Sequence, residues 1–197
     1  MIYLYTGTPG SGKSLHAAED VFYQRLRGGV TIANCPFKET GFLAGKKAQF
    51  WQLPDDPSRL IDFSKDYFKS HRFREEELLI VIDECQLIFN ARTWNDSVRK
   101  DWIRFFTQHR KYGYKIILIT QFSQMIDKQI RALVEIEVIH RKASSLGFVM
   151  SCISLFFGGR LHLASYNYPG MHMHLKTKFF LRNPLYESMY NTHMTWE

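Results

Sequence analysis

Apolar residues in the first two thirds of the chain form two kinds of pattern. Short continuous apolar runs are typical of strands that are buried on both faces of a parallel sheet. Apolar residues that recur every three or four positions are typical of amphipathic helices. The two patterns alternate along the chain, which is the order of a doubly wound parallel α/β sheet. The strand runs cover residues 1–6, 30–34, 49–53, 78–83 and 115–120, and the helical spacings cover residues 13–27, a segment within 55–74, 97–112 and a short helix from Ser123 to Ala132.

The pattern changes after Val134. Residues 135–141 alternate between polar and apolar positions, and Gly158-Gly159 and Pro169-Gly170 are turn signals between the segments that follow. We therefore expect a parallel core in residues 1–142 and a small antiparallel, β-rich extension of the same domain in residues 143–197. Its strand-like runs lie near residues 148–157, 160–168 and 171–181.

The first strand run leads directly into the sequence GTPGSGKS at residues 7–14, which fits the phosphate-binding pattern G-x-x-x-x-G-K-[ST]. Glycines let backbone N–H groups turn toward an anion, and the helix that follows adds the partial positive charge of its N-terminus. Lys13 suits the β- and γ-phosphates of a nucleotide, and the Ser14 hydroxyl suits Mg²⁺. A glycine-rich turn that binds nothing is the alternative, but the flanking strand and helix favour nucleotide binding. The residues predicted to bind the nucleotide are Gly7, Thr8, Pro9, Gly10, Ser11, Gly12, Lys13, Ser14 and Leu15.

Two acids end the apolar run at residues 78–83. Carboxylates at the carboxyl end of a parallel strand lie where α/β sheets bind ligands. Asp83 is the candidate to reach Mg²⁺ together with Ser14, and Glu84 is the candidate base that polarises an attacking water. Gln121, after the next buried run, is a candidate to sense the γ-phosphate or to orient that water. The alternatives are two solvated acids and an ordinary loop glutamine.

Charge that develops on a transferred phosphoryl group is often stabilised by an arginine from a neighbouring subunit. Arg110, just past the helix that contains Trp102, is the first candidate, and Arg92 and Arg131 follow it. The alternative for each of them is a surface arginine.

Composition indicates a folded chain with a basic surface. The 197 residues carry 26 Lys and Arg against 19 Asp and Glu, a net charge of +7. Such a charge suits a phosphate-rich partner or an anionic membrane surface, or it serves solubility alone. The most apolar late run, residues 146–157, is shorter than a membrane-spanning helix, so we expect this chain to be soluble.

The thiols and late histidines point to no further chemistry. Cys35, Cys85 and Cys152 are odd in number and far apart, which predicts reduced thiols in a cytosolic chain. His162, His172 and His174 lack an acid or a cysteine at metal-ligand spacing, so they are interpreted as surface histidines. No nucleophilic triad can be argued from residue order.

The motifs GTPGSGKS (7–14), LLIVIDE (78–84) and ILITQ (117–121) in this order and spacing resemble the N-terminal ATPase domain of the zonula occludens toxin family. This family includes the gene I assembly proteins of filamentous bacteriophages. The resemblance runs from Ile2 to about Arg141 and includes Asn34 and Gln108-His109-Arg110. Tyr190-Asn191-Thr192 is similar to the family's Tyr-Asp-Ser/Thr element, with Asn in place of Asp.

This resemblance implies a P-loop ATPase of the additional-strand group, related to the FtsK and HerA DNA motors, with ATP and Mg²⁺ as cofactors. It implies a homo-oligomeric ring, such as a hexamer, on the cytoplasmic side of the bacterial inner membrane. Members are anchored by one spanning helix, which we expect to lie outside this chain. They hand phage single-stranded DNA from its packaging protein to coat protein during virion assembly and export, and we carry over no toxin activity.

Three functions remain open on the sequence. The first is a motor ATPase whose site is shared between subunits. The second is a nucleotide-gated binding or scaffold module with negligible hydrolysis. The third, a nucleoside or small-molecule kinase, is disfavoured because no arginine-rich lid is evident and Asp83-Glu84 suits activation of water better than a hydroxyl acceptor.

Overall fold

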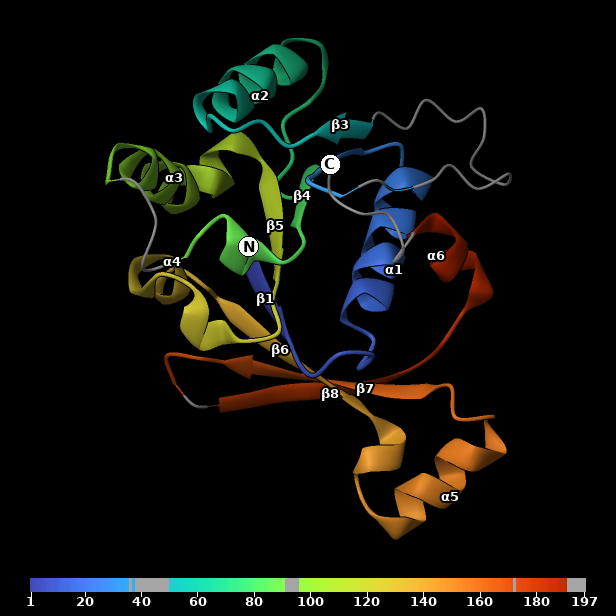
Figure 1. The fold of residues 1–197 in the computed structure, drawn as a ribbon. Coiled ribbons are helices and arrows are strands. Elements are labelled where there is room, and N and C mark those ends of the chain that lie inside the picture. The colour runs from blue at the N-terminus through green and yellow to red at the C-terminus, as the bar shows by residue number, and fades with distance from the viewer. Residues whose placement is uncertain (36, 38–49, 91–95, 172, 191–197) are drawn as a thin grey trace.

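The computed structural model describes residues 1–35, 37, 50–90, 96–171 and 173–190, and its strands form one sheet flanked by helices on both faces (Figure 1). Within these residues the sheet has eight strands in the order β3-β2-β4-β5-β1-β6-β7-β8. The strands are β1 (Ile2–Thr6), β2 (Val30–Ala33), β3 (Phe50–Gln52), β4 (Leu78–Ile82), β5 (Tyr114–Ile119), β6 (Ile136–Lys142), β7 (Leu161–Tyr168) and β8 (Met173–Leu181). The α-helices are α1 (Lys13–Leu26), α2 (Ser58–Ser70), α3 (Asp96–Gln108), α4 (Lys128–Ala132), α5 (Phe148–Phe156) and α6 (Pro184–Met189).

Strand β5 lies between the strand that leads into the glycine-rich loop and the strand that ends in Asp83. It pairs in parallel with β1 on one side, where Leu4 is opposite Leu118, and with β4 on the other. One additional strand therefore separates the two halves of the predicted site. The predicted parallel α/β sheet with an added strand is confirmed.

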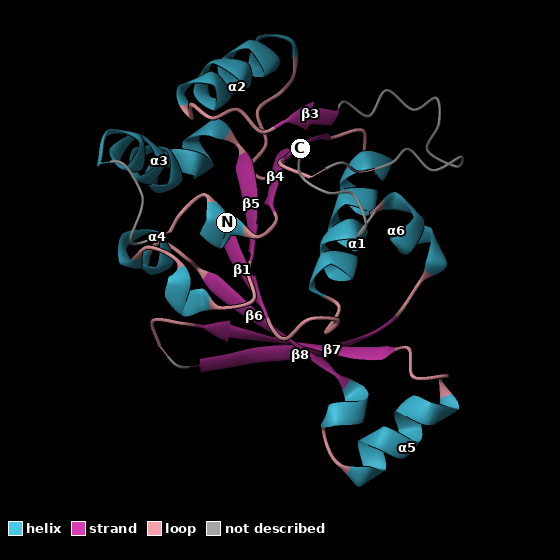
Figure 2. Ribbon diagram, in the orientation of Figure 1, coloured by secondary structure: helices cyan, strands magenta, loops and turns pink. Residues whose placement is uncertain are grey.

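Strand β6 joins the parallel and antiparallel parts of the sheet. It pairs in parallel with β1 and antiparallel with β7, which in turn pairs antiparallel with β8. The C-terminal strands β7 and β8 thus continue the same sheet beyond β6, as Figure 2 shows. Strand β7 is separated from the loop strand β1 only by β6, so residues of β7 come close to the glycine-rich loop.

Alternation along the buried strands divides the core into two layers. In β4, Ile80 packs with Trp102 and Phe106 toward α2, α3 and α4, whereas Val81 packs with Ala17 on the α1 side. Both faces of the central strands are covered, which explains why their sequences are continuous apolar runs. The Trp102 layer is held by edge-to-face ring contacts, such as Phe89 on Trp102 at 5.2 Å between ring centroids.

Two predicted elements are wrong. Residues 148–157 do not form a strand: Phe148–Phe156 is helix α5, and a short apolar run fits either element. The predicted helix from Ser123 to Ala132 is broken. Ser123–Met125 is a 3₁₀ turn, and α4 begins only after Asp127, whose carboxylate accepts a hydrogen bond from the backbone N–H of Gln129 at 2.8 Å.

The last helix was not anticipated from the sequence. Helix α6 begins after Asn183, whose side chain accepts a hydrogen bond from the Leu185 N–H at 2.9 Å, with Pro184 at its first position. It packs beside α1 and leads the chain to Tyr190, at the edge of the predicted site. Arg92, His172, Asn191 and Thr192 lie outside the described residues.

Candidate functional site

The glycine-rich loop joins the carboxyl end of β1 to α1, and two of its glycines cannot be replaced without strain. At Gly7, φ is 142°, and a Cβ atom would lie 2.4 Å from the carbonyl oxygen of His140. At Gly12, the residue before α1, φ is 97° and a Cβ would lie 3.1 Å from the ring of His162. The loop therefore passes close to β6 and β7, and only glycine allows both its left-handed conformation and this approach.

Lys13 and Ser14 begin α1 directly after the loop. The Lys13 ammonium donates hydrogen bonds to the carbonyl oxygens of Gly7 at 2.8 Å and Thr8 at 3.2 Å. Burial lowers the pKa of Lys13, while the Glu84 and Asp83 carboxylates act in the opposite direction. These carboxylates therefore act on the loop lysine electrostatically, although they come from β4.

Asp83 is fixed at the end of β4 by an amide side chain from the neighbouring strand. The Asn34 amide nitrogen donates to the Asp83 carbonyl oxygen, and the Asp83 N–H donates to the Asn34 side-chain oxygen, both at 2.8 Å. Burial raises the pKa of the Asp83 carboxyl group. A buried carboxylate of this kind is stabilised by a cation, which suits the metal role predicted for Asp83.

Glu84 has a left-handed backbone, with φ at 46°. Such a conformation costs on the order of 1 kcal/mol for a residue other than glycine and often occurs at functional sites. The Gln121 amide donates to the Glu84 carboxylate at 3.0 Å, so the structure brings together these two predicted residues from the ends of β4 and β5. The Gln86 amide donates to the second carboxylate oxygen of Glu84.

The side chains around the loop fit a phosphate group and a divalent cation. The Ser11 hydroxyl is buried within the loop and has no hydrogen-bond partner among the described residues. Carboxylate and hydroxyl oxygens, which Asp83 and Ser14 supply, are the ligands that Mg²⁺ prefers. A pocket of about 490 Å³ opens over residues 10–15, and Lys142 and Arg182 add two basic side chains to its wall.

Lys142 and His162 line this pocket and were not predicted as site residues. The Lys142 side chain, at the end of β6, comes within 3.3 Å of the position that a Cβ on Gly10 would occupy. His162 of β7 is buried, and its Nδ1 lies 3.0 Å from the Ser11 carbonyl oxygen. Burial lowers its pKa. The interpretation of His162 as a surface histidine is therefore wrong, because β7 packs beside the loop; His174 is exposed as expected.

A chain of buried polar groups connects the loop strand to β7. His140 Nδ1 lies 3.2 Å from the Thr6 carbonyl oxygen, and its Nε2 lies 2.8 Å from His16 Nδ1. The Tyr166 hydroxyl lies 3.1 Å from His16 Nε2. One set of tautomers satisfies all three contacts: Tyr166 donates to His16, His16 donates to His140, and His140 donates to Thr6. Burial lowers the pKa to about 4 for His16 and about 3 for His140, so both rings are neutral in this arrangement.

Tyr190 contacts both side chains that are predicted to bind the metal. Its hydroxyl donates to the Asp83 carboxylate and also shares a hydrogen bond with the Ser14 hydroxyl. Burial and the charge of Asp83 raise the pKa of Tyr190 well above its ordinary value, which keeps this hydroxyl protonated. The chain segment after α6 is therefore in direct contact with the predicted metal ligands.

Of the candidate arginines, Arg110 and Arg131 lie among the described residues, and neither joins this site within its own chain. Arg110 follows α3 and forms an ion pair with Glu135, whose carboxylate accepts a hydrogen bond from the N–H of Ile2 at the start of β1. Arg110 therefore lies near the amino end of β1, whereas the loop follows the carboxyl end of that strand. Arg131, in α4, donates to the Ser123 carbonyl oxygen at 3.4 Å. A role for Arg110 in a neighbouring subunit stays a prediction.

The fold and these residues define the class of the protein: a P-loop nucleoside triphosphatase fold with an additional strand between the loop strand and the Asp83 strand. The chain belongs to the zonular occludens toxin (Zot) family, whose sequence profile matches residues 1–158. It is 33% identical over 171 residues to the Gene 1 protein of Enterobacteria phage I2-2, and 32% identical over 174 residues to that of Enterobacteria phage M13. The match covers 82% of this chain but 46% and 49% of those proteins, so the chain spans about half their length.

Solved structures support the same fold. The N-terminal domain of zonular occludens toxin from Neisseria meningitidis superposes with a TM-score of 0.56 at 17% identity, over 96% of this chain and 98% of that one. The genome packaging NTPase B204 from Sulfolobus turreted icosahedral virus 2, in complex with ATP-gammaS, gives a TM-score of 0.52 at 12% identity, over 93% of this chain and 97% of that one. At these identities the likeness is evidence of fold alone.

Proposed function

We propose that this domain binds ATP with Mg²⁺ and hydrolyses it, as the ATPase domain of a filamentous phage assembly and export protein. The observation that carries the proposal is the contact between Gln121 and Glu84 beside Asp83, at the edge of the sheet where the loop turns into α1. A loop that only holds phosphate does not need this arrangement of a carboxylate and an amide.

In this proposal, the loop and the polar residues beside it bind different parts of Mg²⁺·ATP. The loop N–H groups and the Lys13 ammonium bind the phosphates, and the ammonium then leaves the Gly7 and Thr8 carbonyl oxygens. Ser14 and Asp83 hold Mg²⁺, which when bound supplies positive charge to the β- and γ-phosphate oxygens. Lys142 adds a second cation beside Gly10.

Glu84 and Gln121 act on water in this proposal. The Glu84 carboxylate accepts a proton from the attacking water, and the Gln121 amide fixes the direction of that carboxylate. The backbone of Glu84 contributes to the aim of the side chain, because its left-handed conformation is set by Asp83 before it and the 3₁₀ turn Cys85–Leu87 after it.

The membership of the Zot family and the similarity to Gene 1 proteins support a motor role in virion assembly. We propose a homo-oligomeric ring in which Arg110 of one subunit reaches the phosphates bound to another. Its proposed partners are phage coat protein, the protein that packages phage single-stranded DNA, and the DNA itself. We place it on the cytoplasmic side of the host inner membrane. No helix among the described residues is long and apolar enough to cross a membrane.

Two variants separate binding from hydrolysis. With a fluorescent ATP analogue and Mg²⁺, we expect Lys13→Ala to lose binding, and Glu84→Gln to bind normally but hydrolyse at least about a hundredfold more slowly. Asp62→Asn, which removes a carboxylate on the exposed face of α2, is the matched control and should behave as the unaltered protein. Equal turnover by the unaltered protein and Glu84→Gln would instead indicate a nucleotide-gated module, a candidate that the contact of Tyr190 with Asp83 favours.

Mixing two inactive variants tests the shared site. Lys13→Ala lacks the phosphate lysine and Arg110→Ala lacks the proposed arginine, so each alone should be inactive. In a mixed ring, a Lys13→Ala subunit can supply Arg110 to an intact loop, and we expect part of the activity to return. Full activity of Arg110→Ala alone would remove Arg110 from the proposal and leave the chemistry at Glu84 unaffected.

A further inference from the structure

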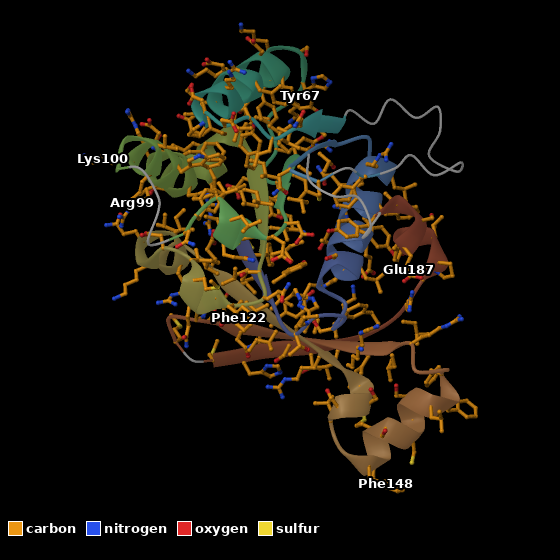
Figure 3. All side chains as sticks on the ribbon, in the orientation of Figure 1. Tyr67, Arg99, Lys100, Phe122, Phe148 and Glu187 are labelled. Atoms are coloured by element: carbon orange, nitrogen blue, oxygen red, sulfur yellow. The ribbon has the colours of Figure 1, made fainter. Side chains whose placement is uncertain are left out.

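Helix α5 extends from the domain with little of the protein around it. It lies beyond the β7–β8 edge of the sheet, apart from the other helices (Figure 1). The 3₁₀ turn Ala143–Ser145 leads into it from β6, and Gly158 and Gly159 end it before β7. In Figure 3, Phe148 lies at the tip of this helix and away from the sheet.

The outward face of α5 is apolar, and its inward face contains serine. Phe148 and Phe156 are 84% and 89% exposed, and Val149 and Leu155 are 69% and 77% exposed. Their positions i, i+1, i+7 and i+8 place them on one side of a helix, together with the exposed Cys152 at i+4. Ser154, by contrast, is buried. A surface helix normally has the reverse arrangement, so this face is suited to contact with another apolar phase.

The stretch of sequence that contains this helix holds most of the net positive charge of the chain. Residues 138–186 contain six Lys or Arg and no Asp or Glu, so one quarter of the chain holds nearly all of the net charge of +7. Arg141 and Lys142 precede α5 and Arg160 follows it, and all three are exposed. The N–H of Arg182 donates to the carbonyl oxygen of Arg160 at 2.8 Å, and the Arg182 side chain is ion-paired with Glu187.

The arrangement of charge selects among the surfaces that could cover α5. A second copy docked through the same face would bring the exposed Arg141 and Arg160 of the two copies together, which costs free energy. A nucleic acid needs cations that reach its phosphates, whereas here Arg141 and Arg160 lie outside the helix and its outward face is aliphatic and aromatic. A bilayer with anionic headgroups matches both features, because the outward face enters the acyl boundary while the Arg side chains remain at the level of the headgroups.

We propose that α5 inserts its outward face into the surface of an anionic lipid bilayer, with the exposed Arg141 and Arg160 bound to the headgroups. The helix has nine residues and a length of about 14 Å, about half of the hydrocarbon thickness, so it lies in the interface and does not span it. This contact holds the mouth of the loop pocket at the membrane surface, because Lys142 and Gly159 line that pocket. The proposal does not depend on ATP hydrolysis.

The cysteines of the chain provide a direct assay. Cys152 is exposed on the outward face of α5, whereas Cys35 and Cys85 are buried, so an environment-sensitive fluorophore can be attached at Cys152 of the folded protein. With vesicles of equal parts phosphatidylcholine and phosphatidylglycerol, we expect its emission to shift to the blue, and with pure phosphatidylcholine to shift much less. Raised salt should reverse the shift. No shift with the anionic vesicles, or a shift caused by single-stranded oligonucleotide or by protein concentration alone, would overturn the proposal.

Vesicle flotation of unlabelled variants separates the apolar and the basic contributions. Phe148→Ser with Phe156→Ser should lower the bound fraction at least about tenfold, and Arg160→Glu should lower it by about fivefold or more. Phe122→Ser removes an exposed aromatic ring from another part of the surface (Figure 3), and Arg72→Glu reverses an exposed charge; neither should change binding. All these side chains are exposed, so the folded domain should persist in every variant. Equal loss with Phe122→Ser and with the α5 variant would contradict the role of α5.

Discussion

Acid should destabilise this domain through the buried pair His16 and His140. Both rings are at most 3% exposed, and burial lowers the pKa to about 4 for His16 and about 3 for His140, against an ordinary value of 6.5. The folded protein keeps both rings neutral at pH 5, whereas the unfolded chain takes up a proton on each as the pH falls below about 6.5. Stability from this pair is therefore complete above pH 6.5 and is lost progressively as the pH falls toward 4.

The size of the effect follows from the pKa difference. At pH 5, each unfolded histidine lies about 1.5 pH units below its pKa, which corresponds to about 2 kcal/mol in favour of unfolding. The two together give about 4 kcal/mol, a large share of the 5–15 kcal/mol that stabilises a typical domain. Burial also lowers the pKa of His109 and His162, which adds to the same trend. The pKa of Asp20 is lowered, so its contribution is lost only below about pH 4, outside this window.

Urea unfolding at pH 7, 6 and 5 measures this dependence. The free energy of unfolding should fall by several kcal/mol between pH 7 and pH 5 in the unaltered protein. His16→Gln and His140→Gln should each be less stable at pH 7 but lose about 2 kcal/mol less on acidification. His174→Gln, at an exposed position, should keep the full pH dependence. If the free energy of unfolding of both variants falls between pH 7 and pH 5 by as much as that of the unaltered protein, the buried pair is not the source of the effect.

Three further substitutions test the loop and its neighbours. Lys142→Ala should weaken Mg²⁺·ATP binding about tenfold in a titration with a fluorescent analogue, because the cation beside Gly10 is lost; unchanged affinity would exclude that role. Tyr190→Phe should raise affinity for Mg²⁺·ATP about fivefold, because one hydrogen bond to Asp83 no longer competes, and weaker binding would contradict this. Gly12→Ala should destabilise the protein to urea by more than the ~1 kcal/mol of Gly28→Ala, since both have positive φ but only Gly12 faces neighbouring rings; equal costs would show that the close packing is unimportant.

The central sheet and the loop could be predicted from the sequence because local patterns determine them. Continuous apolar runs identify strands that are covered on both faces, and the glycines at 7, 10 and 12 identify a strand-to-helix turn. The carboxyl ends of parallel strands meet at one edge, so Asp83, Glu84 and Gln121 were expected near the loop; Asp83 and Glu84 act electrostatically on Lys13, and Gln121 contacts Glu84.

The remaining pocket residues depend on contacts between distant segments. Lys142 and His162 reach the loop only because β6 pairs with β1 and β7 then pairs with β6. Tyr190 lies 107 positions after Asp83 in the sequence. It reaches Asp83 because α6, which precedes it, packs beside α1. Nothing in the local sequence around these residues indicates that proximity.

Helix α5 shows a different limit of the sequence patterns. Its apolar residues are continuous, so spacing cannot distinguish a buried strand from a helix with an exposed apolar face. The polar signal that usually marks the outward face is absent, since the outward positions are Phe148, Val149, Leu155 and Phe156. The structure resolves the ambiguity by showing which of these side chains the domain covers.

The most direct test of the account is Mg²⁺-dependent ATP hydrolysis by the unaltered protein and Glu84→Gln over a series of protein concentrations. A site completed by a neighbouring subunit should give a specific activity that rises with concentration, and Glu84→Gln should remain inactive throughout. If the unaltered protein binds ATP yet hydrolyses it no faster than Glu84→Gln at any concentration, Glu84 is not the base and the domain acts as a nucleotide-gated module.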